Sequence, residues 1–321
     1  MSDSNPLSPS MRLGLLALVA LACAVAFMTI NAHGKWSFIL PFRGLKLATM
    51  VLVGYAIAVS TVLFQTITHN RILTPSIMGF DALFILIQTM VVFGLGLGLT
   101  TTSPSLWRFT FEVVCMTSFA GLLFYWLFSG ALRSLHLMML VGLVCGLLFR
   151  SVSGLLMRLI DPNEFMILQA RMFASFNNIK VELILASLVA IAGVTLIGWS
   201  IRHRYDVLSL GRDVAVNLGV PYQKTLLITL LIISVLVAVS TALVGPIVFF
   251  GLLLANLAYR VMGTDKHRYT LPAAILLGII FLAGGQTILE HVLHLNTTIS
   301  VIIEFSGGIA FLILLTRTKR S

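Results

Sequence analysis

The chain has 321 residues, of which 59% are apolar and 10% are charged, against about 25% charged in a typical soluble domain. With a mean hydropathy of +1.04, this composition excludes a soluble globular protein and predicts an integral membrane protein. The formal net charge of +10 does not indicate nucleic-acid binding, because the cations lie between apolar runs, where they suit anionic lipid headgroups.

Apolar stretches long enough to cross a bilayer recur along the whole chain. A transmembrane helix needs about 20 mostly apolar residues, and ten stretches come near that length. They lie at 13–31, 44–68, 78–99, 107–129, 134–158, 181–200, 223–243, 246–262, 271–292 and 298–316. We therefore predict an all-α polytopic membrane protein with ten transmembrane helices. It forms a single domain over residues 1–321, with a short tail at 1–12.

The distribution of Lys and Arg predicts the orientation of these helices. Ten crossings place both termini on the same side of the membrane. Of the cations, 13 lie in connections on that side and 7 lie on the other. By the positive-inside rule, both termini and the 1–12 tail are expected in the cytoplasm.

A short repeat links the second and seventh predicted spans. Residues 58–61 and 238–241 both read AVST, and each copy is followed by a turn with a proline, Pro75 or Pro246. The copies are five crossings apart, so they run in opposite directions, as in an inverted repeat. Four small residues also match easily by chance in such a chain, so both interpretations stay open.

Two connections are long enough to carry a function. The segment 159–180 mixes polar and apolar residues and predicts an amphipathic helix along the outer interface. The inner segment 205–222 predicts a short helix that Ser209 caps at its start and Gly219 ends in the left-handed conformation. Asp213 suits the first turn of this helix, because the N-terminal end of a helix dipole favours negative charge.

The predicted inner helix carries a narrow apolar stripe. Leu210, Val214 and Leu218 are spaced by four and share one face, whereas Arg212, Asp213 and Asn217 lie off it. A capped amphipathic helix of this kind can dock into a groove on a partner protein. The alternative is a helix that lies on the membrane surface.

Charged residues within the predicted spans are few, and such residues are usually functional or paired. Glu112 and Arg150 lie at similar depth in adjacent spans, and we predict a structural ion pair between them. Glu304 either lines a substrate path or sits in a watery outer vestibule. Asp81 lies near the inner end of its span and is expected to reach water. The chain lacks the midplane array of carboxylates that a proton-driven carrier uses, which disfavours a secondary transporter.

No pattern of an enzyme or of a cofactor site occurs in the sequence. The nucleotide-binding pattern G-x-x-x-x-G-K-[ST] is absent, so any ATP hydrolysis must take place on another chain. His291 and His294 share a helix face, but no cysteine or carboxylate cluster accompanies them, and no metal site is expected.

Four stretches, taken in order, resemble one family of transport proteins. They are LPFR at 40–43, NRILTPSIMG at 70–79, LGRDVAVNLGV at 210–220 and GPIVFFGL at 245–252. The set is similar to the permeases of iron-chelate and cobalamin-type ABC importers and covers most of residues 36–316. The amino-acid sequence of the second stretch resembles that of the family branch that handles ferric siderophores of the catecholate type.

The chain departs from the family pattern at several positions. Arg71 replaces a proline, Ala255 and Asn256 stand where Pro-His is frequent, and residues 284–286 read GGQ in place of an acidic turn. These departures argue against cobalamin more than against iron chelates. The alternatives are a permease for cobalamin, haem or another metal chelate, and a secondary transporter.

The resemblance implies a multi-pass permease of the cytoplasmic (inner) membrane that moves a ferric siderophore inward. Its implied partners are ABC ATPase subunits, a second and different permease, and a periplasmic or extracellular siderophore-binding protein. The implied coupling residues are Ser209, Leu210, Gly211, Arg212, Asp213, Val214, Asn217, Leu218 and Gly219. Arg43 and Lys46 are implied to dock the binding protein. Ser60, Thr61, Gln65 and Glu304 are candidates for the translocation pathway, and close helix packing is the alternative for the small residues.

Overall fold

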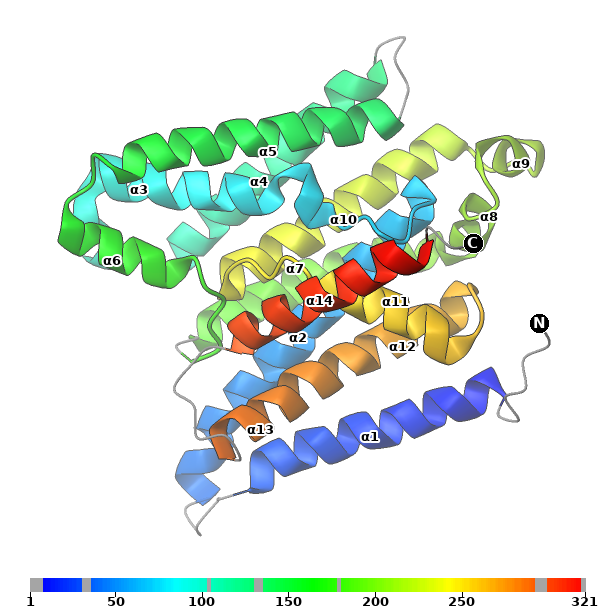
Figure 1. The fold of residues 1–321 in the computed structure, drawn as a ribbon, viewed down its shortest axis with the longest axis horizontal. Coiled ribbons are helices and arrows are strands. Elements are labelled where there is room, and N and C mark those ends of the chain that lie inside the picture. The colour runs from blue at the N-terminus through cyan, green and yellow to red at the C-terminus, as the bar shows by residue number, and fades with distance from the viewer. Residues whose placement is uncertain are drawn as a thin grey trace.

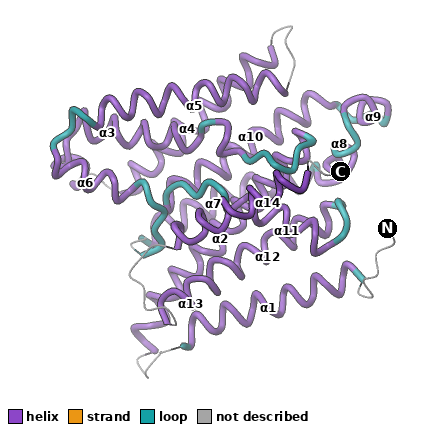
Figure 2. Tube along the Cα trace, viewed as in Figure 1, coloured by secondary structure: helices purple, strands orange, loops and turns teal. Residues whose placement is uncertain are grey.

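A computed structural model describes residues 8–30, 36–102, 105–129, 135–177, 180–291 and 299–318. Within these ranges the chain is helical or in loops, and no residue is in a strand (Figure 2). The predicted all-α class is therefore confirmed.

The helices follow one another along the chain with short connections. They are α1 (Pro9–Thr29), α2 (Trp36–Thr68), the 3₁₀ helix η1 (Pro75–Met78), α3 (Phe80–Thr102), α4 (Ser105–Ser129), α5 (Leu135–Met157), α6 (Pro162–Arg171), α7 (Val181–Ser200), α8 (Arg202–Leu208), α9 (Arg212–Asn217), α10 (Tyr222–Val244), α11 (Phe250–Met262), α12 (His267–Ile279), the π-helical turn η2 (Ile280–Gly284), α13 (Gly285–His291) and α14 (Ile299–Thr318).

Seven of the described helices are long and apolar enough to cross a membrane. They span Pro9–Thr29, Ile39–Thr68, Ser105–Trp126, Leu137–Met157, Val181–Ser200, Tyr222–Val244 and His267–His291. Shorter apolar helices cover Phe80–Gly94, Phe250–Met262 and Ile299–Ile309. The long helices run roughly side by side along the longest axis of the molecule (Figure 1), as expected for a multi-pass membrane protein.

Helices α2 and α10 form the centre of the bundle. They pack against each other, while α2 also contacts α12 and α10 also contacts α4 and α7. Most of α10 and α2 is buried, whereas only 11% of α1 and 17% of the α7 span are. Small residues allow close contact, and a Cβ on Gly54 of α2 would lie 3.3 Å from the backbone of Gly278 in α12.

The helical path breaks after α2 and after α10. Gly79, at the end of the first break, has φ +84°, and Gly245, which opens the second, has φ +103°. Each packs tightly against backbone: a Cβ on Gly79 would lie 2.8 Å from Gly146 of α5, and one on Gly245 would lie 3.1 Å from Ala174. The first break runs beside α10 within the bundle (Figure 1). Non-helical backbone at such a depth requires surrounding protein or a cavity.

The two ends of the bundle carry different short helices. The start of α1, the end of α14, α8 and α9 lie at one end, and α6 lies at the other (Figure 1). A helix within 159–180 is confirmed as α6, where the Asp161 side chain accepts a hydrogen bond from the Asn163 amide. Its position on the outer membrane interface stays a prediction.

Candidate functional site

The segment 205–222 folds as two short helices instead of the single helix expected from Ser209 onward. The Ser209 hydroxyl donates to the Asp206 carbonyl oxygen at 2.6 Å, so this residue closes α8 and does not cap α9. Gly211 precedes α9 with φ +100°, a conformation that glycine adopts without strain. The predicted left-handed stop at Gly219 is confirmed by its φ of +80°.

The apolar stripe on this segment faces away from the rest of the chain. The exposed fractions of Leu210, Val214 and Leu218 are 59%, 44% and 61%, whereas Ala215 is fully buried. Arg212, Asp213 and Asn217 are exposed as well. We call residues 209–219 the coupling surface, after the role that was predicted for them. Its apolar side chains make it suited to contact with a partner or with lipid.

Hydrogen bonds tie α8 to two helices of the bundle. Asp206 accepts from the His267 backbone N–H at 2.9 Å and lies 2.6 Å from His267 Nδ1. The other ring nitrogen of His267 lies 2.7 Å from the Thr66 hydroxyl of α2. Because His267 begins α12, one connected network joins α8, α12 and α2.

Further contacts of α8 reach α10. Arg204 Nη1 donates to the Thr225 hydroxyl at 3.4 Å, and Tyr205 is buried beside His267, with ring centroids 5.8 Å apart. Burial raises the pKa of Tyr205 to about 12, so its phenol stays neutral. Burial alone would raise the pKa of Asp206, but the hydrogen bonds and charge of His267 and the charge of Lys266 outweigh it and lower the pKa below its usual value.

The two copies of the AVST repeat meet at one cavity between α2 and α10. Its lining comes from both helices, from both breaks and from the starts of α3 and α11: Ile57, Ser60, Thr61, Thr74, Pro75, Ser76, Asp81, Val237, Ser240, Thr241, Gly245, Ile247, Val248 and Gly251. We call it the central cavity. The structure therefore brings the repeated residues together, which supports the inverted-repeat interpretation.

The four pathway candidates fall in different places. Ser60 and Thr61 are buried and line the central cavity. Gln65 is buried too, but its amide donates to the Arg71 carbonyl oxygen at 2.8 Å and does not line that cavity. Glu304 is partly exposed on α14. Their role in a translocation pathway stays a prediction.

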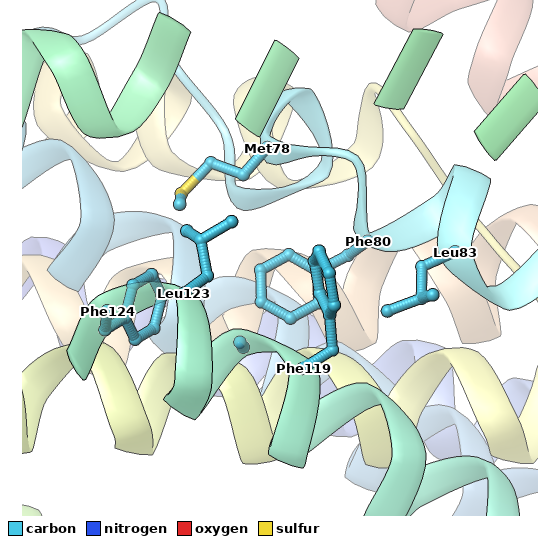
Figure 3. A pocket seen from close by; sticks show the side chains of 7 residues that line it. Met78, Phe80, Leu83, Phe119, Leu123 and Phe124 are labelled. Carbon is cyan, nitrogen blue, oxygen red and sulfur yellow. The ribbon is translucent and has the colours of Figure 1, made fainter. Parts of the chain in front are cut away.

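A second pocket is wholly apolar. Figure 3 shows side chains from η1 and α3 facing side chains from α4: Met78, Phe80, Leu83, Phe119, Leu123 and Phe124. Ligand sites combine apolar walls with a few placed polar groups. This pocket has none, and we treat it as a packing space between helices.

The predicted ion pair between Glu112 and Arg150 is wrong. Glu112 pairs instead with Arg108, one turn earlier on the same helix, at 3.2 Å, and accepts from Gln88 Nε2 of α3 at 2.6 Å. Arg108 also donates to the Gln88 side-chain oxygen. A partner four residues away on the same helix needs no alignment of two helices. Arg150 instead lies exposed on α5.

Asp81 also differs from the expectation. It was expected to reach water at the inner end of its span, but it is 4% exposed and lines the central cavity. The break after α2 explains this, because residues 69–79 return into the bundle before α3 begins.

Arg43 and Lys46, which were predicted to lie on the outer side, make contacts within the chain. Arg43 Nη1 donates to the carbonyl oxygens of Phe27, Met28 and Ile30 at 3.0, 3.3 and 2.6 Å, at the end of α1. Lys46 pairs with Glu290 at 3.3 Å, and its side chain is 12% exposed. These contacts give both cations a structural role, and their role in docking a binding protein stays a prediction.

Metal-binding side chains do not gather within the described ranges, where no group of three His, Cys, Asp or Glu could hold a metal ion. His291 ends α13, and His294 lies outside the residues that the structure describes.

Comparison with known proteins agrees with the architecture. The model of the FecCD transport family matches residues 9–317. The petrobactin import system permease protein YclO of Bacillus subtilis is 44% identical over 311 residues, which cover 97% of this chain and 98% of that protein. The permease protein FatC of the Bacillus anthracis petrobactin import system is 38% identical over 277 residues, covering 86% and 78%.

A solved structure shares the fold. A metal-chelate type ABC transporter in an inward-facing conformation superposes with a TM-score of 0.83 and covers 96% of this chain and 99% of its own, at 23% identity. Because the family model spans nearly the whole chain, this protein belongs to the FecCD transport family.

Proposed function

We propose that this chain is a permease subunit of an ABC importer that moves a ferric siderophore into the cytoplasm across the cytoplasmic membrane. The observation that carries the proposal is the 44% identity, over 97% of the chain, with a petrobactin import permease. Ferric petrobactin is therefore the first substrate to test. The chain itself is no enzyme, and the energy comes from ATPase subunits on other chains.

The proposed topology has ten crossings and cytoplasmic termini. The seven long apolar helices and the three shorter ones together supply these crossings. The helix ends nearest the two termini share one end of the bundle with α8 and α9 (Figure 1). The excess of Lys and Arg in the connections at that end supports its assignment to the cytoplasm. Residues 1–321 then form one permease domain, with 1–12 as a tail and 205–222 as the cytoplasmic coupling loop.

The coupling surface is proposed to rest on an ABC ATPase. Its apolar stripe is exposed in this chain, and Arg212 and Asp213 flank the stripe with opposite charges. A groove on the ATPase would bury the stripe and pair the charges. Movement of α8 and α9 would then pass to α2, α10 and α12 through the hydrogen bonds of Arg204, Asp206 and His267.

A second, different permease would complete the pore, and a siderophore-binding protein would deliver the substrate at the opposite end. Arg150 and Glu304 support an interface of this kind, because charged side chains inside a membrane face water or protein, not lipid. Ser60, Thr61, Gln65 and Glu304 remain the candidates for the pathway, and Arg43 and Lys46 remain the candidates for docking.

The coupling surface is tested by reversing its charges. The double variant Arg212→Glu with Asp213→Lys should abolish ATP-driven uptake of ferric petrobactin and co-purification of the ATPase, while the chain still inserts in the membrane. The matched control is Glu182→Lys at the exposed start of α7, distant from α9 in the fold, which should retain uptake and the ATPase. Normal uptake by the double variant would refute the coupling assignment.

The substrate is tested by competition. In cells that express the complete transporter, unlabelled ferric petrobactin should suppress uptake of the labelled chelate, and cobalamin should not. Suppression by cobalamin alone would overturn the siderophore assignment but leave the family membership and the coupling surface in place.

A further inference from the structure

The central cavity lies at the meeting point of the two breaks in the helical path. Thr74, Pro75 and Ser76 line it from the break after α2, and Gly245 to Val248 contribute from the break after α10. The cavity has room for a water-sized occupant. In transporters, helix breaks of this kind place backbone and side-chain oxygens around small ions.

The two repeated serines line the cavity, and both already donate their hydroxyl proton within their own helix. Ser60 Oγ donates to the Ile57 carbonyl oxygen at 3.1 Å, and Ser240 Oγ donates to the Val237 carbonyl oxygen at 3.0 Å. A hydroxyl has one proton and two lone pairs. Because each serine donates its hydroxyl proton within its own helix, its oxygen can only accept a hydrogen bond or bind a cation in the cavity. An occupant must therefore bring positive charge or donors.

Asp81 adds a negative charge to the same wall. Its side chain receives a hydrogen bond from Ser76, but its Oδ2 atom is buried and accepts none from the described residues. Asp81 lies in the first turn of α3, where the helix dipole stabilises the ionised carboxylate. A buried carboxylate that lacks a counter-charge is costly.

The neighbouring charges do not supply that counter-charge. Arg150 and Glu304 both interact electrostatically with Asp81 and carry opposite charges. No Lys or Arg lies within 4.0 Å of the Asp81 carboxylate among the described residues. The Asp81 carboxylate therefore has no direct cationic partner among the described residues.

We propose that the central cavity binds one monovalent cation of the size of sodium, held by the Asp81 carboxylate and the hydroxyl oxygens of Ser60 and Ser240. A single carboxylate matches a single positive charge, and hard oxygen ligands suit a hard cation. The ion would tie α2, α3 and α10 together where both helical paths break. This inference goes beyond the proposed function, because chelate transport by an ABC importer does not itself require such an ion.

The test measures binding through thermal stability and does not depend on transport. The complete transporter complex, with a fluorescent tag on this chain, is heated in detergent at pH 8 in NaCl, KCl or choline chloride at equal ionic strength. The surviving assembly is measured by size-exclusion chromatography. A ligand that binds the folded state raises the midpoint temperature of thermal unfolding. We expect 100 mM NaCl to raise this temperature by about 2–4 °C relative to choline chloride. KCl should raise it by less.

Two kinds of variant connect the effect to the cavity. Asp81→Asn should abolish the difference between NaCl and choline chloride, and the control Glu182→Gln, an exposed carboxylate on α7, should retain it. If Asp81→Asn does not assemble, Ser240→Ala decides the question: it should raise the sodium concentration needed for half of the shift by about threefold or more.

Three results would overturn the proposal. They are equal midpoints in the three salts, a sodium effect that persists in Asp81→Asn, and an unchanged sodium dependence in Ser240→Ala. None of these results bears on siderophore uptake, so the proposed function stands or fails separately.

Discussion

Asp206 and His267 are joined by two short contacts, from the backbone N–H of His267 at 2.9 Å and from its Nδ1 at 2.6 Å. An ionised carboxylate can only accept, so Nδ1 carries a proton. The opposite nitrogen, Nε2, lies against the Thr66 hydroxyl of α2 at 2.7 Å. This imidazole therefore connects the helix before the coupling surface with the central helix of the bundle.

Replacing His267 should loosen α8 from the bundle. His267→Ala removes the ring that bridges Asp206 and Thr66, and a hydrogen bond to a charged group contributes about 1.5–3 kcal/mol. Because half of the Asp206 side chain is exposed, we expect the lower end of that range. Amide hydrogen exchange of residues 202–208 should become about tenfold faster. The control His203→Ala, on the exposed face of α8, should leave that rate unchanged; equal exchange in the two variants would contradict the bridge.

The contact should also depend on pH in a defined direction. Because the pKa of Asp206 is lowered in the folded chain, its contribution to stability is complete above the unfolded carboxyl pKa of about 3.9. It is lost as the pH falls through the lower, folded pKa. Once corrected for intrinsic exchange, the protection of α8 amides should fall as the pH passes below about 3.9. Unchanged protection across that range would contradict an ionised Asp206.

Arg108 should matter more for stability than Arg150. Arg108→Met leaves Glu112 buried without its cation, and breaking a buried ion pair costs about 3–5 kcal/mol. Arg150→Met removes an exposed side chain and should change the free energy of unfolding by under about 1 kcal/mol. Thermal unfolding of the purified complex measures which of the two variants loses more stability. Equal losses in both variants would restore a structural role for Arg150.

Gly251 should not tolerate a side chain. A Cβ at this position would lie 2.1 Å from Thr61 Oγ1 and 3.2 Å from Ile57 Cγ2. Gly251→Ala should therefore cost about 1–3 kcal/mol through overpacking, and the second substitution Thr61→Ala should recover part of it. The control Gly193→Ala in α7, where no atom lies within 4 Å, should be neutral or slightly stabilising. A stable Gly251→Ala protein would show that α11 approaches α2 less closely.

The structural role of Arg43 at the end of α1 can be separated from its proposed role in docking the binding protein. Arg43→Gln loses three contacts to carbonyl oxygens at the end of α1, so the end of α1 should fray and proteolysis there should quicken several-fold. If the cation also docks the binding protein, the affinity for that protein should fall as well. Thr29→Val, which removes a hydroxyl bonded to the Val25 carbonyl oxygen, is a control that disturbs the same helix end without changing charge. Equal binding-protein affinity in the two variants would remove the docking role.

Several features were determined by the sequence alone. Membrane insertion and the all-α class follow from length and hydropathy, because a bilayer leaves a long apolar chain few other ways to satisfy its backbone. The stop at Gly219 and the outward stripe of Leu210, Val214 and Leu218 follow from local periodicity and from the freedom of glycine at positive φ. These features depend on neighbours in the chain, which a sequence displays directly.

Only the tertiary structure decided which distant residues meet. Gln88 of α3 meets Glu112 and Arg108 of α4, Asp206 meets His267, and the two AVST copies meet Asp81 at one cavity. Each outcome depends on how helices rotate about their axes and on where the path breaks, and a rotation of a few tens of degrees exchanges the partners of a side chain. Local sequence carries no record of that rotation, because the packing of the whole bundle sets it.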